Sequence, residues 1–115
     1  MPGVQTIFPV MLDHVNNKKL QLEQLMKLMC ENPVKIFGIK NKGFLKENYD
    51  ADITIVDLNK SIKIQNEDIQ SKCGWSPFNG QSFKGSPVAT IINGKIKMLN
   101  GKILGEPEGL PLDFD

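Results

Sequence analysis

The stretch that decides the fold reads Val88-Ala89-Thr90-Ile91-Ile92-Asn93-Gly94-Lys95-Ile96-Lys97-Met98-Leu99. An Asn-Gly pair separates an apolar run from a segment in which Ile96 and Met98 alternate with lysines. Asn and Gly both adopt positive φ readily, as the two central residues of a type I′ turn must. The stretch therefore predicts a β-hairpin, and Asn100-Gly101 predicts a second turn directly after it.

The segment ahead of this hairpin also has strand character. Ile53, Ile55 and Leu58 lie among polar residues, and Ile62 and Ile64 flank Lys63. Alternation with a period of two is typical of strands that bury one face, so we expect half-buried strands here with Ile53 and Ile55 on the inner side.

Two segments of the second half lack such a pattern. Residues 66–86 are rich in Gly, Ser and Asn, with Trp75, Phe78 and Phe83 among them, and predict a long ordered loop. The tail from Glu106 is acidic and contains prolines, which predicts loose packing.

The first third has helical periodicity. Thr6 is a candidate N-cap for a helix that Asn16-Asn17 ends, and its apolar positions follow i, i+3, i+4, i+7 spacing at Phe8, Met11, Leu12 and Val15. A second helix carries Leu22, Leu25, Met26 and Met29 on one face. Asn32-Pro33 predicts the N-cap and first position of a short third helix to Phe37, with Gly38 in the left-handed position that ends it.

Composition excludes several classes of function. The chain has 115 residues, 40 % of them hydrophobic, and a formal charge of +1, which suits one soluble α+β domain with a modest core. All fourteen cations are lysines, so no guanidinium can bind a carboxylate or phosphate with two parallel bonds. The balanced charge and few aromatic residues argue against a nucleic-acid partner. No apolar run is long enough for a membrane span, and we expect a cytosolic chain.

Few residues could carry catalysis or bind a metal. His14 is the sole histidine, and it lies between apolar positions of the first helix. Cys30 and Cys73 are distant from each other and follow no ligand spacing, so we expect free, structural thiols. A zinc site needs three or four such ligands in one place, and a nucleophile needs a base with an orienting group. The residues therefore predict no metal, no bound cofactor and no catalytic residue in this chain.

Charged clusters have a simpler interpretation. Asp50, Asp52 and Asp57 flank a strand near solvent, where we favour solubility and turn chemistry over acid–base catalysis. The three lysines between residues 40 and 46 are typical of a solvated face.

Several motifs together resemble one family, the dihydroorotases of the cyclic amidohydrolase superfamily, and specifically their C-terminal part. Pro2-Gly3-Val4-Gln5-Thr6 with Pro9 resembles the loop and last helix of the barrel. Cys30-Glu31-Asn32-Pro33 with Phe37-Gly38 resembles a helix junction of the family. Lys42-Gly43 with Tyr49-Asp50-Ala51-Asp52-Ile53 resembles a strand that is shared across the superfamily. The most specific match is Lys72-Cys73-Gly74-Trp75-Ser76-Pro77-Phe78 with Gly80, Thr90 and Asn93-Gly94, which is similar to one bacterial dihydroorotase group.

The resemblance implies an architecture. Residues 1–43 would correspond to the last two or three helices of a (β/α)₈ barrel, and residues 44–115 to part of the small β-sandwich domain that follows it. A complete barrel of this type needs roughly 250 residues, so this chain could supply a fragment at most.

The resemblance also implies a function and its limit. The family catalyses the reversible cyclisation of N-carbamoyl-L-aspartate to dihydroorotate in pyrimidine biosynthesis, with zinc. Its metal ligands and its substrate-binding arginine would all precede Met1. Only the loop at Pro2 and Gly3 remains as a substrate contact, and a glycine that simply permits the turn is an equal alternative. We therefore expect the isolated chain to be inactive.

Two classes of function stay open. The chain could complete a barrel supplied by a companion chain, or it could be a non-enzymatic interaction module that packs on a partner or on itself. The sequence does not separate a gene remnant, a separately encoded half and a piece of a longer protein.

Overall fold

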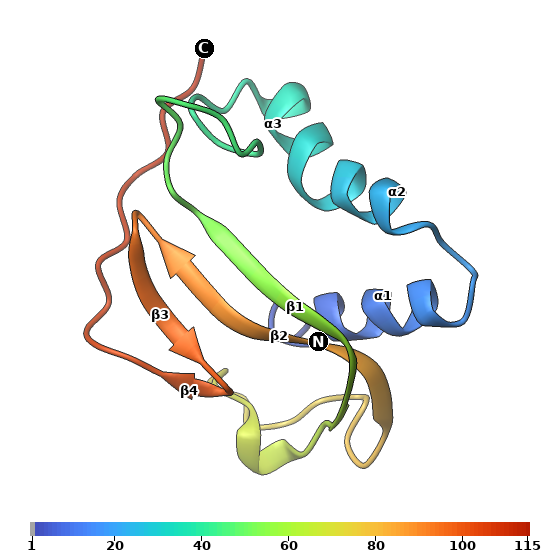
Figure 1. The fold of residues 1–115 in the computed structure, drawn as a ribbon. Coiled ribbons are helices and arrows are strands. Elements are labelled where there is room, and N and C mark those ends of the chain that lie inside the picture. Colours follow the sequence, from blue (N-terminus) through green and yellow to red (C-terminus); the bar gives the residue numbers. More distant parts are fainter. Residues whose placement is uncertain (1) are drawn as a thin grey trace. The chain divides into compact units, whose positions relative to one another are not determined.

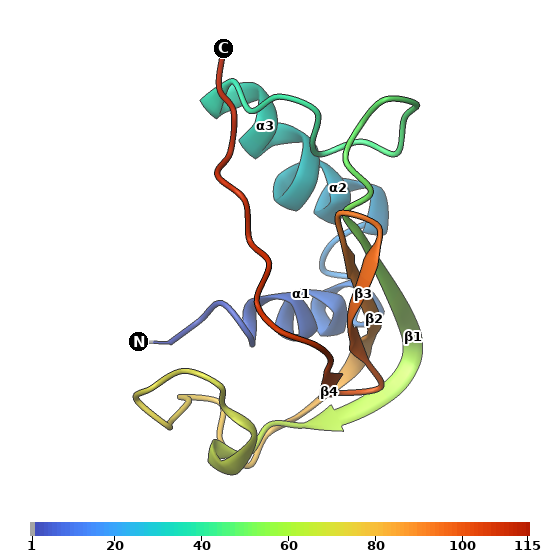
Figure 2. The same ribbon diagram turned by 90° about the vertical axis from the view of Figure 1, so that its left-hand side faces the viewer.

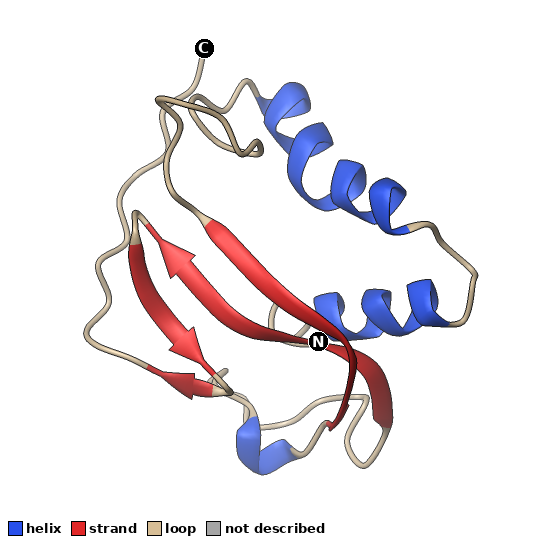
Figure 3. Cartoon of the chain, in the orientation of Figure 1, coloured by secondary structure: helices blue, strands red, loops and turns tan. Residues whose placement is uncertain are grey.

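The computed structural model describes residues 2–115. The helices come first along the chain and the strands follow, as Figure 3 shows, which confirms the α+β class. The helices are α1 (Ile7–Asn16), α2 (Leu22–Met26) and α3 (Asn32–Phe37), with a π-helical turn at Lys27–Glu31 and a 3₁₀ turn at Asn66–Asp68. The strands are β1 (Ile53–Lys63), β2 (Ser82–Ile92), β3 (Lys95–Leu99) and β4 (Lys102–Ile103).

Helix α1 has the predicted ends. Thr6 is its N-cap, although the Thr6 hydroxyl donates back to the carbonyl of Gly3 and does not cap the helix. Asn17 is the C-cap, and its N–H donates to the carbonyl of Asp13 at 2.9 Å. Leu12 is completely buried, and it anchors the apolar face of the helix.

The predicted third helix is present as α3, but it continues the helical segment before it, and the expectation that Asn32 is an N-cap was wrong. Asn32 has helical φ and ψ, and its N–H donates to the carbonyl of Lys27, five residues earlier. Pro33 has no N–H and its ring crowds the preceding turn, so a wider π-helical turn lets the helix continue through it. The helix ends as predicted at Gly38, whose φ is 62°.

The strand order in the sheet is β1-β2-β3-β4, and the β2–β3 and β3–β4 pairs are antiparallel. Asn93 and Gly94 have φ of 49° and 77°, so the predicted type I′ hairpin is confirmed. Asn100 and Gly101 form the second turn with φ of 48° and 82°. The register shifts between Thr90 and Ile91, which leaves a bulge on the opposite strand.

Burial along β1 agrees with the expectation except at Ile55, and Ile53 is half-buried as expected. Ile55 is 49 % exposed, whereas Val56, Leu58 and Ile62 are half-buried, and Ile64, just after the strand, is buried. Strand β1 carries apolar residues on both faces, so the alternation alone did not fix which face turns inward.

The predicted loop ends earlier than residue 86, because β2 begins at Ser82. The Gly and Ser content of residues 66–86 suggested a loop, but α1 packs directly on the backbone of this strand at Gly85. A Cβ on Gly85 would lie 2.6 Å from the Cβ of Leu12. The side chain of Asn16 donates to the carbonyls of Lys84 at 2.8 Å and Leu58 at 3.0 Å, and it ties α1 to both strands (Figure 1).

The chain forms two compact units. One joins the segment up to Gln21 with Val56–Pro87, and the other joins Leu22–Ile55 with Val88–Asp115. None of the helices within residues 2–115 has both the length and the apolar character that crossing a membrane requires.

Every residue of the C-terminal tail from Glu106 is exposed, in line with the expected loose packing, but hydrogen bonds anchor the tail within the second unit. After β4 it runs without regular structure to the segment that follows α3 (Figure 2). There the N–H of Lys40 donates to the carbonyl of Asp113, and the N–H of Asp115 donates to the carbonyl of Gly38. The composition of the tail indicated no strand, and this pairing is a single bridge between Ile39 and Phe114.

Candidate functional site

The predicted substrate contact lies where the chain turns into α1. Pro2 and Gly3 are both partly exposed. The carbonyl of Gly3 accepts the N–H of Thr6 at 3.1 Å and the N–H of Ile7 at 2.9 Å. The loop is therefore joined rigidly to the first turn of the helix.

The backbone around Gly3 does not itself require a glycine. Its φ lies outside the left-handed region, and a Cβ built there meets no heavy atom within 4 Å. Gly43 differs, because its φ is +82° and a Cβ would lie 2.8 Å from the carbonyl oxygen of Cys30. The open space beside Gly3 can admit a ligand against the bare backbone.

Gln5 links this loop to a distant part of the chain. Its side-chain Nε2 donates to the carbonyl of Asp68 at 2.8 Å, and its Oε1 accepts the N–H of Gln70 at 2.9 Å. These partners are 63 and 65 residues away. No periodic pattern in the sequence indicates such a pairing, so Gln5 was not predicted as a separate functional residue.

The loop that Gln5 holds is ordered by its own side chains. The carboxamide oxygen of Asn66 accepts the N–H of Ser76 at 2.9 Å, and the carboxamide oxygen of Asn79 accepts the N–H of Asn66 at 2.9 Å. Ser76 is buried, and its Oγ accepts the N–H of Phe78. The order predicted for this loop is confirmed for residues 66–81, and its specific motif includes residues that fix its shape.

The two thiols are free, as predicted, but their environments differ. Cys30 is half-buried, and burial, reinforced by Glu31, raises the pKa of its thiol. Cys73 is exposed, so the expectation of a buried structural thiol was wrong there. A hydrogen bond with Ser71, at 3.2 Å between Sγ and Oγ, lowers the pKa of the Cys73 thiol.

The residues present do not fit the family's metal centre. Within residues 2–115, no three His, Cys, Asp or Glu side chains gather closely enough to hold an ion. The Nδ1 of His14 is buried without a hydrogen-bond partner among these residues. We therefore derive no catalytic step from a metal in this chain.

The acidic cluster has a structural partner instead. Lys42 pairs with both Asp50 and Asp52, and the other carboxylate oxygen of Asp52 accepts the N–H of Asn93 at 2.8 Å. Burial raises the pKa of Asp52, but the hydrogen bonds from Lys42 and Asn93 outweigh it and leave the pKa lowered. The bonds with Asp52 and then Asp50 raise the pKa of Lys42. This cluster holds the start of β1 to the hairpin turn, in line with the expected turn chemistry.

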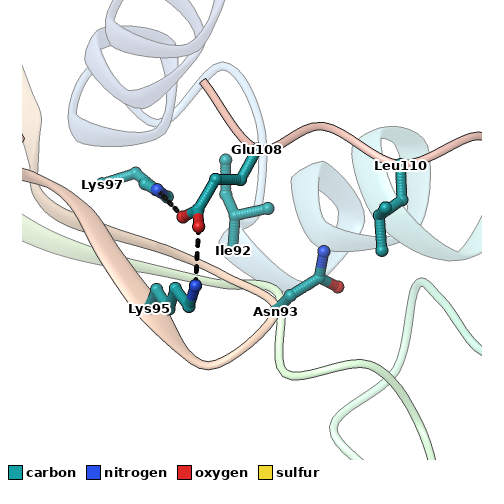
Figure 4. Close-up of a pocket in the computed structure, with 6 residues that line it drawn as sticks. All are labelled: Ile92, Asn93, Lys95, Lys97, Glu108 and Leu110. Carbon is teal, nitrogen blue, oxygen red and sulfur yellow. Dashed lines mark hydrogen bonds and ion pairs between the residues drawn. The ribbon is translucent and has the colours of Figure 1, made fainter. Parts of the chain in front are cut away.

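A shallow hollow of about 220 Å³ lies between β3 and the tail (Figure 4). Ile92 and Leu110 supply apolar walls, and the carboxylate of Glu108 lies between the ammonium groups of Lys95 and Lys97. These two lysines lower the pKa of Glu108 to about 2. The charges satisfy one another, so the hollow serves to anchor the tail.

Comparison with known proteins places this geometry in a family. The model of the amidohydrolase family matches residues 5–97. The dihydroorotase of Pyrococcus furiosus is 42 % identical over 109 residues, which cover 95 % of this chain and 26 % of that protein. An L-hydantoinase of Paenarthrobacter aurescens is 40 % identical over 106 residues, covering 90 % of this chain and 23 % of that protein.

A solved structure of a related enzyme has the same fold as this chain. The solved L-hydantoinase (dihydropyrimidinase) from Arthrobacter aurescens superimposes with a TM-score of 0.86 at 39 % identity, over 90 % of this chain and 24 % of its own. The chain spans about a quarter of the length of the relatives that it matches. The resemblance to dihydroorotases inferred from the motifs is confirmed, and the chain belongs to the amidohydrolase family.

Proposed function

We propose that this chain is the C-terminal part of a dihydroorotase-like enzyme, inactive alone and active when a companion chain supplies the rest of the barrel. The reaction of the completed enzyme is the reversible cyclisation of N-carbamoyl-L-aspartate to dihydroorotate, with release of one water. The observation that carries this proposal is the coverage: 42 % identity to a dihydroorotase along 95 % of this chain, but along 26 % of that enzyme.

Exposed apolar side chains support a missing partner. On the continuous helix and the loop after it, Ile36 is 74 % exposed, Phe37 65 % and Leu45 80 %. A soluble domain rarely leaves so many large apolar groups of one region in water unless another surface covers them. In this proposal, residues 1–43 supply the last barrel helices and residues 44–115 supply part of the small β-sandwich.

Pro2 and Gly3 are the proposed substrate contacts. The absence of a side chain at Gly3 leaves the backbone open, and the bonds from Thr6 and Ile7 to its carbonyl hold it in place. A rigid backbone edge without a side chain can lie close against the ring of the substrate and bond to the polar atoms of its cyclic amide. The metal and the groups that act on the ring come from the companion chain.

Complementation tests the proposal. This chain is mixed with Pyrococcus furiosus dihydroorotase from which the matching quarter has been removed, and ring closure of N-carbamoyl-L-aspartate is followed. We expect turnover from the mixture and none from either part. Association without turnover would instead favour a non-enzymatic interaction module, and no association would leave a gene remnant.

Substitution of Gly3 tests the substrate contact. Gly3→Val places a side chain where the substrate is proposed to contact the backbone of Gly3. We expect kcat/KM of the mixture to fall by about 10-fold or more. Gly109→Val is the matched control, because Gly109 also has open space around it and a φ outside the left-handed region. Equal activity of the two variants would refute the role of Gly3.

A hydantoin substrate provides the second arm of the assay. The L-hydantoinase relative is 40 % identical over 90 % of this chain, close to the value for the dihydroorotase. Both substrates have a ring with a cyclic amide, so the same mixture is tested with dihydroorotate and with a 5-substituted hydantoin. Faster opening of the hydantoin would replace the first proposal with a hydantoinase.

A further inference from the structure

The carboxamide of Gln5 acts as one rung of a backbone ladder. It donates to the carbonyl of Asp68 and accepts the N–H of Gln70, so it pairs with two alternate residues as a neighbouring strand would. At neutral pH a carboxamide is the side chain that offers a donor and an acceptor side by side in this way. Glutamate would keep the acceptor and lose the donor, and methionine would lose both.

Both ends of this link are themselves fixed. On one side, Gln5 directly precedes Thr6, which is 3 % exposed and donates to the carbonyl of Gly3. On the other side, the 3₁₀ turn at Asn66–Asp68 is held by the side chain of Asn79 and by the bond from Ser76 to Asn66. The link therefore connects two ordered segments rather than a rigid one and a loose one.

We infer that Gln5 is a positioning residue for the loop at Pro2 and Gly3. This inference rests on the proposed function. The backbone of the loop is anchored at Gly3, whose carbonyl accepts bonds from the first turn of α1. Gln5 adds a second anchor from the 68–70 segment, which fixes the direction in which the bare backbone of Gly3 faces a substrate. Misplacement of a contact by about 1 Å can lower a rate up to 100-fold.

Hydrogen exchange tests the link in the chain as it exists. Gln5→Met keeps the length of the side chain and removes both bonds, and we expect exchange at the amide of Gln70 to rise by about 5-fold or more. Gln24→Met is the matched control, because Gln24 is an exposed residue of α2. Unchanged exchange at Gln70 would overturn the inference at its first step.

Kinetics of the complemented enzyme test the positioning role. We expect Gln5→Met to lower kcat/KM by about 10- to 100-fold, while Gln24→Met leaves it unchanged. Gln5→Glu should lose activity near neutral pH and recover part of it as the pH falls, because a protonated carboxyl can again donate to the carbonyl of Asp68. Urea unfolding of the same variant at each pH separates the two roles, because a recovery of kcat/KM that only follows recovered stability would indicate a structural link.

The outcomes separate the two proposals. Failure of the wild-type mixture to turn over any substrate overturns the proposed function and, with it, the positioning role of Gln5. If the wild-type mixture turns over and Gln5→Met and Gln24→Met have equal kcat/KM, only the positioning role is overturned. Activity loss in Gln5→Met without recovery of Gln5→Glu at lower pH would also refute it.

Discussion

Replacement of Gly85 by alanine tests the packing of α1 on the sheet. The new Cβ would lie 2.6 Å from the Cβ of Leu12 and 3.4 Å from its carbonyl carbon. Carbon atoms in contact normally stay about 3.5–4.0 Å apart, so the helix and the strand must separate by about 1 Å. A rotamer change cannot relieve the contact, because the position of a Cβ is set by the backbone.

Two costs add at this position. Overpacking of a core typically costs about 1–3 kcal/mol, and Leu12 is fully buried. The φ of Gly85 is +110°, where a residue with a Cβ carries about 1–3 kcal/mol of backbone strain. The separation also lengthens the bond from Asn16 to the carbonyl of Lys84. We expect the free energy of unfolding to fall by about 2–5 kcal/mol, which is a large part of the stability of a small domain.

Gly80→Ala isolates the contact from the backbone strain. Gly80 has a φ of +81°, but a Cβ there meets nothing within 4 Å. We expect this control to lose only the strain, about 1–2 kcal/mol. Both variants are unfolded with urea at a concentration where the chain sediments as a monomer, and the loss of helical circular dichroism is followed. Equal loss of stability in the two variants would refute direct packing of α1 on the strand backbone.

Three further predictions follow from the charges and the exposed surface. Asp52→Ala should lower the free energy of unfolding by about 1–2 kcal/mol in urea titrations at neutral pH, because Lys42 and the N–H of Asn93 lose a charged partner. The folded pKa of Asp52 is lowered, so this stability is present above its ordinary value of 3.8 and is lost as the pH falls through the folded pKa; a difference between wild type and variant that persists at still lower pH would contradict the assignment. Elemental analysis of the purified chain should find no stoichiometric zinc, and one tightly held zinc per chain would disprove this. Sedimentation should show self-association or partial unfolding through the exposed apolar groups, with the Val88 to Leu99 hairpin the most persistent element, whereas a compact monomer with a concentration-independent melt would contradict it.

Local chemistry made part of the fold predictable. The Asn-Gly turns and the left-handed end at Gly38 each depend on the φ preferences of one or two residues. These preferences act within a few residues along the chain, so a sequence pattern contains all of the necessary information. The structure confirms each of these predictions.

Contacts between distant segments made the rest unpredictable. Gly85 indicated a loop because the helix that packs against it is more than 60 residues away. The same applies to the bonds of Gln5 with the 68–70 segment and to the anchoring of Asp113 by Lys40. Ile55 faces outward because β1 carries apolar residues on both faces, and the choice depends on what packs against the strand.

The motifs that resemble the family differ in what they can show about function. In the stretch shared across the superfamily, Lys42 pairs with Asp50 and Asp52, and Asp52 also holds the hairpin turn at Asn93. A clamp of this kind maintains the architecture for any ring substrate, so its presence indicates the fold and not the reaction. Gly3 differs from these residues, because the local backbone conformation and packing do not require a glycine there. A residue type that the local fold does not demand is the better evidence for a ligand, and the choice between a dihydroorotase and a hydantoinase therefore depends on the substrate arms of the complementation assay.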